Sequence, residues 1–287
     1  MSKITDNYPG KELSTDELKQ QLVQDSEIKN AKELKFPTEI IDLPSKGLLY
    51  PKGHPLAAGK VEMKYMTAKE EDILTSQNLI QKGVVIDMLL RSLIVGNGEG
   101  ERIDYDDLVL GDKNAIMVAA RVLGYGADYK IDITCPACGV KSSEVVNLAD
   151  LENKIIDGYP ENENKFEYKL PLSKRVLTFK VLSHRDEAVI TEAVKRKKKQ
   201  TRSSQVSYEL TSRLKQMIIA VDGEEDRNEI NSFVENEFIS RDSLSFRKHL
   251  DSVTPDVDMT YFFECKECGH EEQLSIPLTV EFFWPRV

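Results

Sequence analysis

All four cysteines of the sequence belong to two short motifs of the form Cys-x-x-Cys-Gly. The first motif contains Cys135 and Cys138, and the second contains Cys265 and Cys268. This spacing lets both sulfur atoms of a motif bind one metal ion, while the glycine adopts the conformation that ends the turn. Together the motifs supply four thiolates, which fill a tetrahedral shell. We therefore expect one structural Zn²⁺ with no open coordination position for catalysis.

Two other uses of paired cysteines fit the sequence less well. A thioredoxin-like redox motif has its first cysteine at the start of a helix, whereas a strand pattern follows each motif here. A pair of disulfides would need an oxidising compartment. The first residues of the chain lack the apolar core of a signal peptide, so we expect synthesis and folding in the reducing cytosol.

The segments around each cysteine motif alternate between apolar and polar residues. Residues 129–133 precede the first motif and residues 261–263 precede the second, and both predict hairpins of the zinc-ribbon type. The block from Asp112 to Gly139 aligns without a gap onto the block from Asp242 to Gly269, at an offset of 130 residues. The two motifs therefore occupy equivalent places in an internal duplication.

The duplication extends toward the N-terminus. Residues 64–75 align with residues 180–191, and in each copy a strand pattern leads into a hydroxyl N-cap, Thr67 or Ser183, with acidic residues in the first helical turn. Residues 89–94 and 214–219 then match as amphipathic helices before a glycine turn. We predict an α+β fold of two tandem pseudo-equivalent repeats. Each repeat would consist of a strand, helices, a strand, a cysteine knuckle formed by one Cys-x-x-Cys-Gly motif, and a further strand. The zinc-ribbon-like four-cysteine site would join them.

The sequence predicts four parts along the chain. Residues 1–35 are polar and charged and should form a mobile tail. Residues 36–58 mix apolar residues with prolines and glycines, which predicts an extended arm. Residues 59–160 would form the first repeat with the first knuckle, and residues 161–287 the second repeat with the second knuckle.

Apolar side chains near both ends are candidates for binding partner proteins. The arm carries Leu48, Leu49 and Tyr50, and the C-terminus carries Phe283 and Trp284. An arm stiffened by proline loses little entropy when it docks on a partner. The alternative for both segments is packing against the chain's own body. The sequence leaves both alternatives open.

The net charge of −10 disfavours binding to nucleic acid, and no apolar stretch is long enough to cross a membrane. The exception is the basic run Lys195–Lys199, followed by Arg202. We expect it to be a solvated helix end or an inserted loop, since it lacks interleaved aromatic residues. A second hypothesis for function uses this segment: a zinc-ribbon adaptor that binds nucleic acid through the basic loop 195–202.

The sequence contains no motif that indicates catalysis. The acidic residues of 70–72 and 186–187 lie in first helical turns, where they stabilise the helix dipole. A phosphate-binding loop, a dinucleotide fingerprint and a nucleophile elbow are all missing from the sequence. We therefore expect no enzymatic activity and no small-molecule substrate.

Three segments, residues 43–51, 66–74 and 111–116, resemble in combination the T4-type bacteriophage baseplate proteins. That family is associated with the central hub of contractile tails and with its assembly. The resemblance implies a structural or assembly protein of the tail baseplate hub that contacts other phage tail proteins. It also implies a location in the virion tail, with the host cytoplasm as the site of assembly, and it carries over no catalytic residue.

Overall fold

The computed structural model describes residues 37–154, 156, 158–200, 207–276 and 280–283. The predicted tail, residues 1–35, lies outside the described residues, and so does Trp284. The described residues from Thr38 onward belong to one compact unit. Helices and strands are both present in this unit, which confirms the α+β class.

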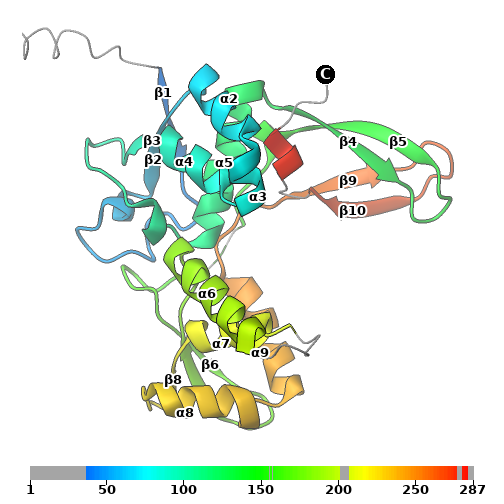
Figure 1. Ribbon diagram of the computed structural model, residues 1–287. Helices are drawn as coiled ribbons and strands as arrows, with labels where there is room; N and C mark the ends of the chain where they lie inside the picture. Colours follow the sequence, from blue (N-terminus) through cyan, green and yellow to red (C-terminus); the bar gives the residue numbers. More distant parts are fainter. Residues whose placement is uncertain (1–36, 155, 157, 201–206, 277–279, 284–287) are drawn as a thin grey trace, which may run out of the picture. The chain divides into compact units, whose positions relative to one another are not determined.

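The first half of the unit, residues 38–160, begins with a three-stranded antiparallel sheet (Figure 1). Strand β2 lies in its centre and pairs with β1 on one side and β3 on the other. Helices connect β2 to β3, and the longest helix of this half leads into a two-stranded hairpin. The elements are β1 (Thr38–Asp42), η1 (Pro55–Ala58), β2 (Lys60–Lys64), α2 (Ala68–Thr75), α3 (Gln77–Lys82), α4 (Val85–Leu93), β3 (Ile94–Gly96), η2 (Tyr105–Asp107), α5 (Leu110–Tyr125), β4 (Asp128–Thr134), β5 (Lys141–Asn147) and η3 (Leu148–Asp150).

The second half, residues 161–287, also has a three-stranded antiparallel sheet followed by helices and a two-stranded hairpin. Its central strand β7 pairs with β6 and β8. The register shifts between Glu62 and Met63 in β2 and between Thr178 and Phe179 in β7. The elements are β6 (Phe166–Lys169), β7 (Val176–Phe179), α6 (His184–Gln200), α7 (Glu209–Met217), β8 (Ile218–Val221), α8 (Arg227–Ser232), η4 (Phe233–Glu237), α9 (Ser240–Val253), β9 (Thr260–Glu264), β10 (Glu271–Ser275) and η5 (Val280–Phe283).

A buried carboxylate closes the start of the first helix in each half. Glu70 accepts hydrogen bonds from the N–H and hydroxyl of Thr67, at 3.0 and 2.6 Å, and from the Lys64 ammonium at 2.8 Å. Burial acts to raise the pKa of Glu70, but these donors outweigh it and lower that pKa to about 2. Asp186 accepts the same three kinds of bond from Ser183 and Lys180. Glu70 and Asp186 therefore cap helices, as the sequence predicted for the acidic residues of these first turns.

A second buried carboxylate holds the turn that follows the first strand of each half. Asp112, on α5, accepts hydrogen bonds from the backbone N–H and the hydroxyl of Ser45 and from the Tyr50 hydroxyl. Asp242, on α9, accepts backbone N–H bonds from Leu172 and Ser173. Both side chains are fully buried, and burial raises the pKa of Asp112 to about 6. Each acid ties a helix to a turn that lies far from it in the sequence.

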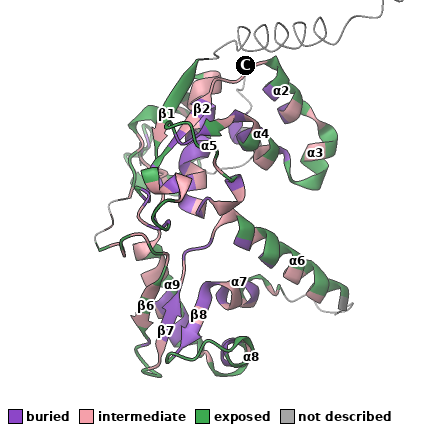
Figure 2. Ribbon diagram, turned by 90° about the vertical axis from the view of Figure 1, so that its left-hand side faces the viewer, coloured by how far each residue is buried: buried purple, intermediate pink, exposed green. Residues whose placement is uncertain are grey.

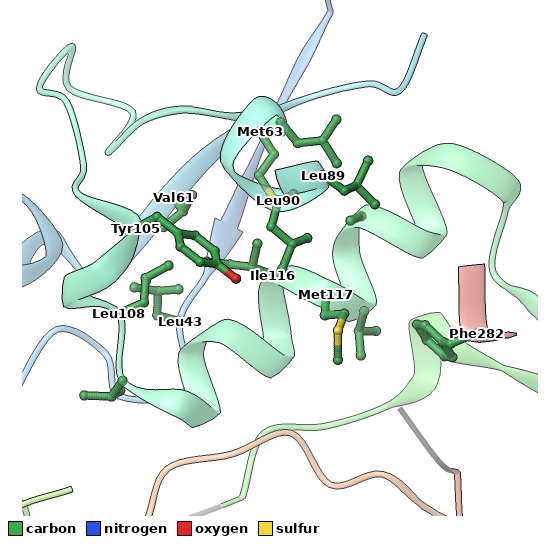
Figure 3. Close-up of a cluster of buried hydrophobic side chains, with 14 of the residues drawn as sticks. Leu43, Val61, Met63, Leu89, Leu90, Tyr105, Leu108, Ile116, Met117 and Phe282 are labelled. Carbon is green, nitrogen blue, oxygen red and sulfur yellow. The ribbon is translucent and has the colours of Figure 1, made fainter. Parts of the chain in front are cut away.

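Each half has its own cluster of buried apolar side chains. The first lies between the β1–β2–β3 sheet and helices α4 and α5 (Figure 3), and the second lies around β7, β8 and Phe246. Phe282 and Phe283 come from the end of the chain but belong to the first cluster. The Phe282 carbonyl accepts a 3.1 Å hydrogen bond from Arg121, and its ring packs on Tyr129 with centroids 5.1 Å apart. The C-terminal segment thus returns to the first half.

These positions correct the predicted partner-binding residues. Leu49, Tyr50 and Phe283 belong to the buried core, so they offer no surface to another protein. The Tyr50 hydroxyl also accepts a hydrogen bond from the N–H of Val109, which fixes the arm to α5. The start of the arm is held in a sheet, because all five residues of β1, Thr38–Asp42, pair with β2. Leu48 is half-buried, so it retains some accessible surface.

The basic run lies on a helix. Helix α6 continues to Gln200, so residues 195–200 form a helix end, which was one of the two expected structures, and the alternative of an inserted loop is wrong for them. Residues 201–202 lie outside the described residues. Lysine and arginine favour helices, and cations are stabilised near a helix C-terminus. Most of α6 is exposed or half-buried (Figure 2). Along the described residues, no helix has the length and apolar content needed to cross a membrane.

Substitution of Leu49 tests the burial of the arm. The change Leu49→Asp should lower the free energy of unfolding by about 3 kcal/mol or more, because a charge would replace a core side chain. Thermal melting of the isolated protein should then show a fall of roughly 6–12 °C. Ile40→Asp is the matched control, since Ile40 lies on the same arm and is 54% exposed. An unchanged melting temperature for Leu49→Asp would show that the arm does not belong to the core.

Candidate metal centre

Two hairpins carry the cysteines. In the first, β4 pairs with β5 from Asp128 opposite Asn147 to Thr134 opposite Lys141. In the second, β9 pairs with β10 from Thr260 opposite Ser275 to Glu264 opposite Glu271. The hairpins lie side by side in Figure 1. Each cysteine motif forms the turn of its hairpin, as the alternating segments predicted.

The two cysteine turns have the same backbone hydrogen bonds. The N–H of Gly139 donates to the carbonyl of Cys135 at 2.9 Å, and the N–H of Gly269 donates to the carbonyl of Cys265 at 2.8 Å. The first cysteine of each motif donates its own N–H across the turn, to Val140 or His270. Both glycines have a positive φ, 75° and 66°, which other residues adopt at a cost. The trailing glycine of each motif therefore has a structural role.

The turns bring all four sulfur atoms together. They lie within 4.8 Å of one another. The Sγ atoms of Cys135 and Cys268 are 3.8 Å apart, and those of Cys138 and Cys265 are 3.7 Å apart. A disulfide needs about 2.05 Å, so these pairs are not bonded. A tetrahedral site with metal–sulfur bonds of about 2.3 Å has edges of about 3.8 Å, which fits the observed separations.

The environment of the thiols also fits a metal site. Cys135 and Cys265 are buried, whereas Cys138 and Cys268 are exposed. Backbone N–H groups of Cys138 and Ala137 lower the pKa of Cys135 to about 7. The N–H of His270 acts in the same direction on Cys268, but the neighbouring sulfur atoms outweigh it and raise that pKa to about 12. A bound cation would lower the pKa of each thiol and favour four thiolates.

Contacts between distant segments hold the hairpins beside each other. The N–H of Lys154 donates to the carbonyl of Asp256 at 2.9 Å, and the N–H of Asp258 donates to the carbonyl of Glu152 at 2.7 Å. Ile133 and Phe263 pack with the two buried cysteines in a small apolar cluster. The cysteine site is therefore held in place by backbone hydrogen bonds and by apolar packing as well as by its own ligands.

The structure brings together the four predicted ligands, Cys135, Cys138, Cys265 and Cys268. It places the other predicted site residues elsewhere, since Leu49, Tyr50 and Phe283 lie in the first core cluster. Sequence reasoning missed the anchoring role of Asp112 and Asp242. Two features of the sequence could have indicated it. Both acids are the first residues of the blocks aligned at an offset of 130 residues, and each binds a turn that contains a serine, Ser45 or Ser173.

Comparison with known proteins gives one match to a family model. The family described as T4 bacteriophage base plate protein matches residues 37–284. This range includes both three-stranded sheets and both cysteine turns. Neither curated proteins nor solved structures give a match.

Loss of two ligands from one turn tests the shared site. The double change Cys135→Ser and Cys138→Ser should abolish binding of the one metal ion per chain, because Cys265 and Cys268 alone leave a half-site. Metal content measured by native mass spectrometry should fall from one to zero, and the melting temperature should fall with it. Thr134→Ser, next to the ligand on an exposed position, should keep the metal. A full complement of metal in this double variant would mean that the two turns do not share an ion.

Proposed function

The chain belongs to the T4 bacteriophage base plate protein family, and we propose that it is a structural and assembly component of the hub of a contractile tail baseplate. It would act through contacts with other phage tail proteins. The match over residues 37–284, which spans nearly all of the described chain, is the observation that carries this proposal. Family membership implies a location in the virion tail, and we add the host cytoplasm as the place of assembly.

Zinc is the metal that the four-cysteine site suits best. Four thiolates in tetrahedral array are typical of structural zinc, which supplies binding energy to folding and does not activate water. The four ligands would be Cys135, Cys138, Cys265 and Cys268. Ligands 127 residues apart in the sequence, such as Cys138 and Cys265, would close a long loop, which makes the entropic gain from cross-linking large. Such a site favours a structural protein over an enzyme.

We further infer that the two halves are pseudo-equivalent repeats that the metal site joins. The matched features are the central strand with a register shift, the capping acid, the buried acid that holds a turn, and the cysteine turn. Chance similarity of helical segments would not reproduce side-chain hydrogen bonds at matching positions. Two ligands from each repeat would then fix the hairpins of the two repeats to each other.

The nucleic-acid hypothesis has weaker support. Lys195–Lys199 lie on α6, and part of their charge is already used within the chain. Arg196 pairs with Glu192 on the same helix, and Lys197 pairs with Glu235 at 3.2 Å. The net charge of −10 would also oppose a polyanion. Protein–protein contact in the baseplate therefore remains the function we propose.

Analysis of particles tests the proposed role. Mass spectrometry should detect the chain in purified virions or in baseplate assembly intermediates. A phage that lacks the chain should accumulate incomplete tails, and the wild-type chain and Thr134→Ser supplied in trans should both restore infectious particles. The double variant Cys135→Ser and Cys138→Ser should fail to restore them, since hairpins that share no ion would no longer keep their arrangement. Absence of the chain from both particles and intermediates would contradict the proposal.

A further inference from the structure

The starts of two helices from different halves pair with each other. Leu110 is the first residue of α5, and its N–H donates to the carbonyl of Leu182 at 3.1 Å. His184 is the first residue of α6, and its N–H donates to the carbonyl of Leu108 at 2.8 Å. The first N–H groups of a helix have no partner inside the helix, so each helix start satisfies the other. Val109 and Ser183 form the antiparallel bridge between these bonds.

Each half has a segment that matches one side of this junction but lies elsewhere in the chain. We call the backbone of these two segments, at the starts of α2 and α9, the two edges. The offset of 130 residues places Phe238–Ser240, at the start of α9, on residues 108–110. The alignment of residues 64–75 with 180–191 places Met66–Ala68, at the start of α2, on residues 182–184. Among the described residues, the N–H groups of Ala68 and Ser240 donate no hydrogen bond to the backbone outside their own helices. Each edge is therefore available to another chain.

The exposure of these edges differs from that of the internal pair. Val109 is 2% exposed at the internal junction, whereas its counterpart Ile239 is 42% exposed. Leu182 is buried, and its counterpart Met66 is half-buried. An apolar side chain beside an unpaired backbone edge is typical of a contact surface.

The charges of the two edges are complementary. At the internal junction, Arg185 on α6 binds Asp107 at 2.8 Å. The counterpart of Arg185 is Lys69, and the counterpart of Asp107 is Glu237. Both counterparts are exposed, and each has the same sign of charge as the residue it matches. Glu237 also pairs with Arg175 of its own chain at 2.6 Å, so Lys69 would join an existing ion pair. An edge with Lys69 therefore suits an edge with Glu237, as it would in a second copy.

We propose that a second copy of this chain docks head to tail, with Met66–Ala68 of one copy against Phe238–Ser240 of the other. The proposal rests on the pseudo-equivalence of the two halves inferred above. The contact would reproduce the antiparallel bridge of the internal junction and add the Lys69–Glu237 pair. Because the two surfaces differ, the contact is heterologous and leads to a ring or an open chain of copies.

The new contact should be weaker than the internal one. The internal junction joins two parts of one chain, whereas a second copy must give up translational and rotational freedom to dock. We expect association in the range of about 10 µM to 1 mM.

Two variants each block one surface. Ala68→Pro removes one donor N–H but suits the first helical position, and Thr67 has the extended conformation that precedes proline. Ile239→Asp puts a charge in the contact at an N-cap position that favours aspartate. Each should weaken self-association about tenfold or more. Ala68→Ser, which keeps the N–H, and Leu210→Asp, 45% exposed on α7, are the matched controls.

Sedimentation equilibrium of the metal-loaded full chain measures the outcome. The average mass of the wild type and of both controls should rise above 32.6 kDa with concentration. Each blocked variant alone should show a clearly smaller rise, and an equimolar mixture of the two should form a heterodimer, because one intact surface of each kind remains. A wild type that is monomeric up to about 1 mM would overturn the proposal, as would a mixture that stays monomeric. A monomeric chain still found in tail particles would overturn this inference and leave the proposed function intact.

Discussion

Four thiols within 4.8 Å of one another cannot all ionise without a nearby cation, because like charges at that distance raise each other's pKa. Hydrogen bonds with the neighbouring sulfur atoms, together with burial, raise the pKa of Cys268 to about 12 and favour its protonated form. The two turns nevertheless hold their backbone N–H groups toward the sulfur atoms, an arrangement that favours thiolates. Backbone hydrogen bonds between Glu152, Lys154 and the segment 256–258 bring the two hairpins to the place where a single ion can satisfy all four ligands.

Each half is organised by charged groups that have been taken out of water. Glu70 and Asp186 fix the step from strand to helix, and Asp112 and Asp242 fix a helix to a remote turn. A buried carboxylate is costly unless several donors satisfy it, so each of these acids constrains the backbone around it. Removing any one donor would leave part of that cost uncompensated. A few buried polar contacts therefore fix the backbone of each half, in addition to its apolar cluster.

Local patterns made much of the fold predictable. The spacing of Cys135, Cys138, Cys265 and Cys268 predicted a shared site because ligand geometry limits the spacing within a turn. The caps at Thr67 and Ser183 predicted helix starts because the N–H groups there need acceptors. The α+β class follows from these signals together.

Segments with two physically reasonable environments were not predictable in the same way. Apolar residues such as Leu49 and Phe283 suit either a partner surface or the chain's own core. Their burial depends on contacts with α5 and with Arg121, which lie far from them in the sequence. The run Lys195–Lys199 likewise suits a loop or a helix end, and the pairs made by Arg196 and Lys197 lie on or against a helix. The burial of Asp112 could not be predicted from its own segment, because its hydrogen-bond donor Ser45 lies in a turn 67 residues away.

X-ray absorption spectroscopy at the zinc edge, on the purified full chain with its metal content measured on the same sample, tests the shared four-cysteine site most directly. We expect one zinc per chain surrounded by four sulfur atoms at about 2.3 Å. Fewer than four sulfur neighbours, or a stoichiometry other than one zinc per chain, would contradict a single structural ion held by both hairpins.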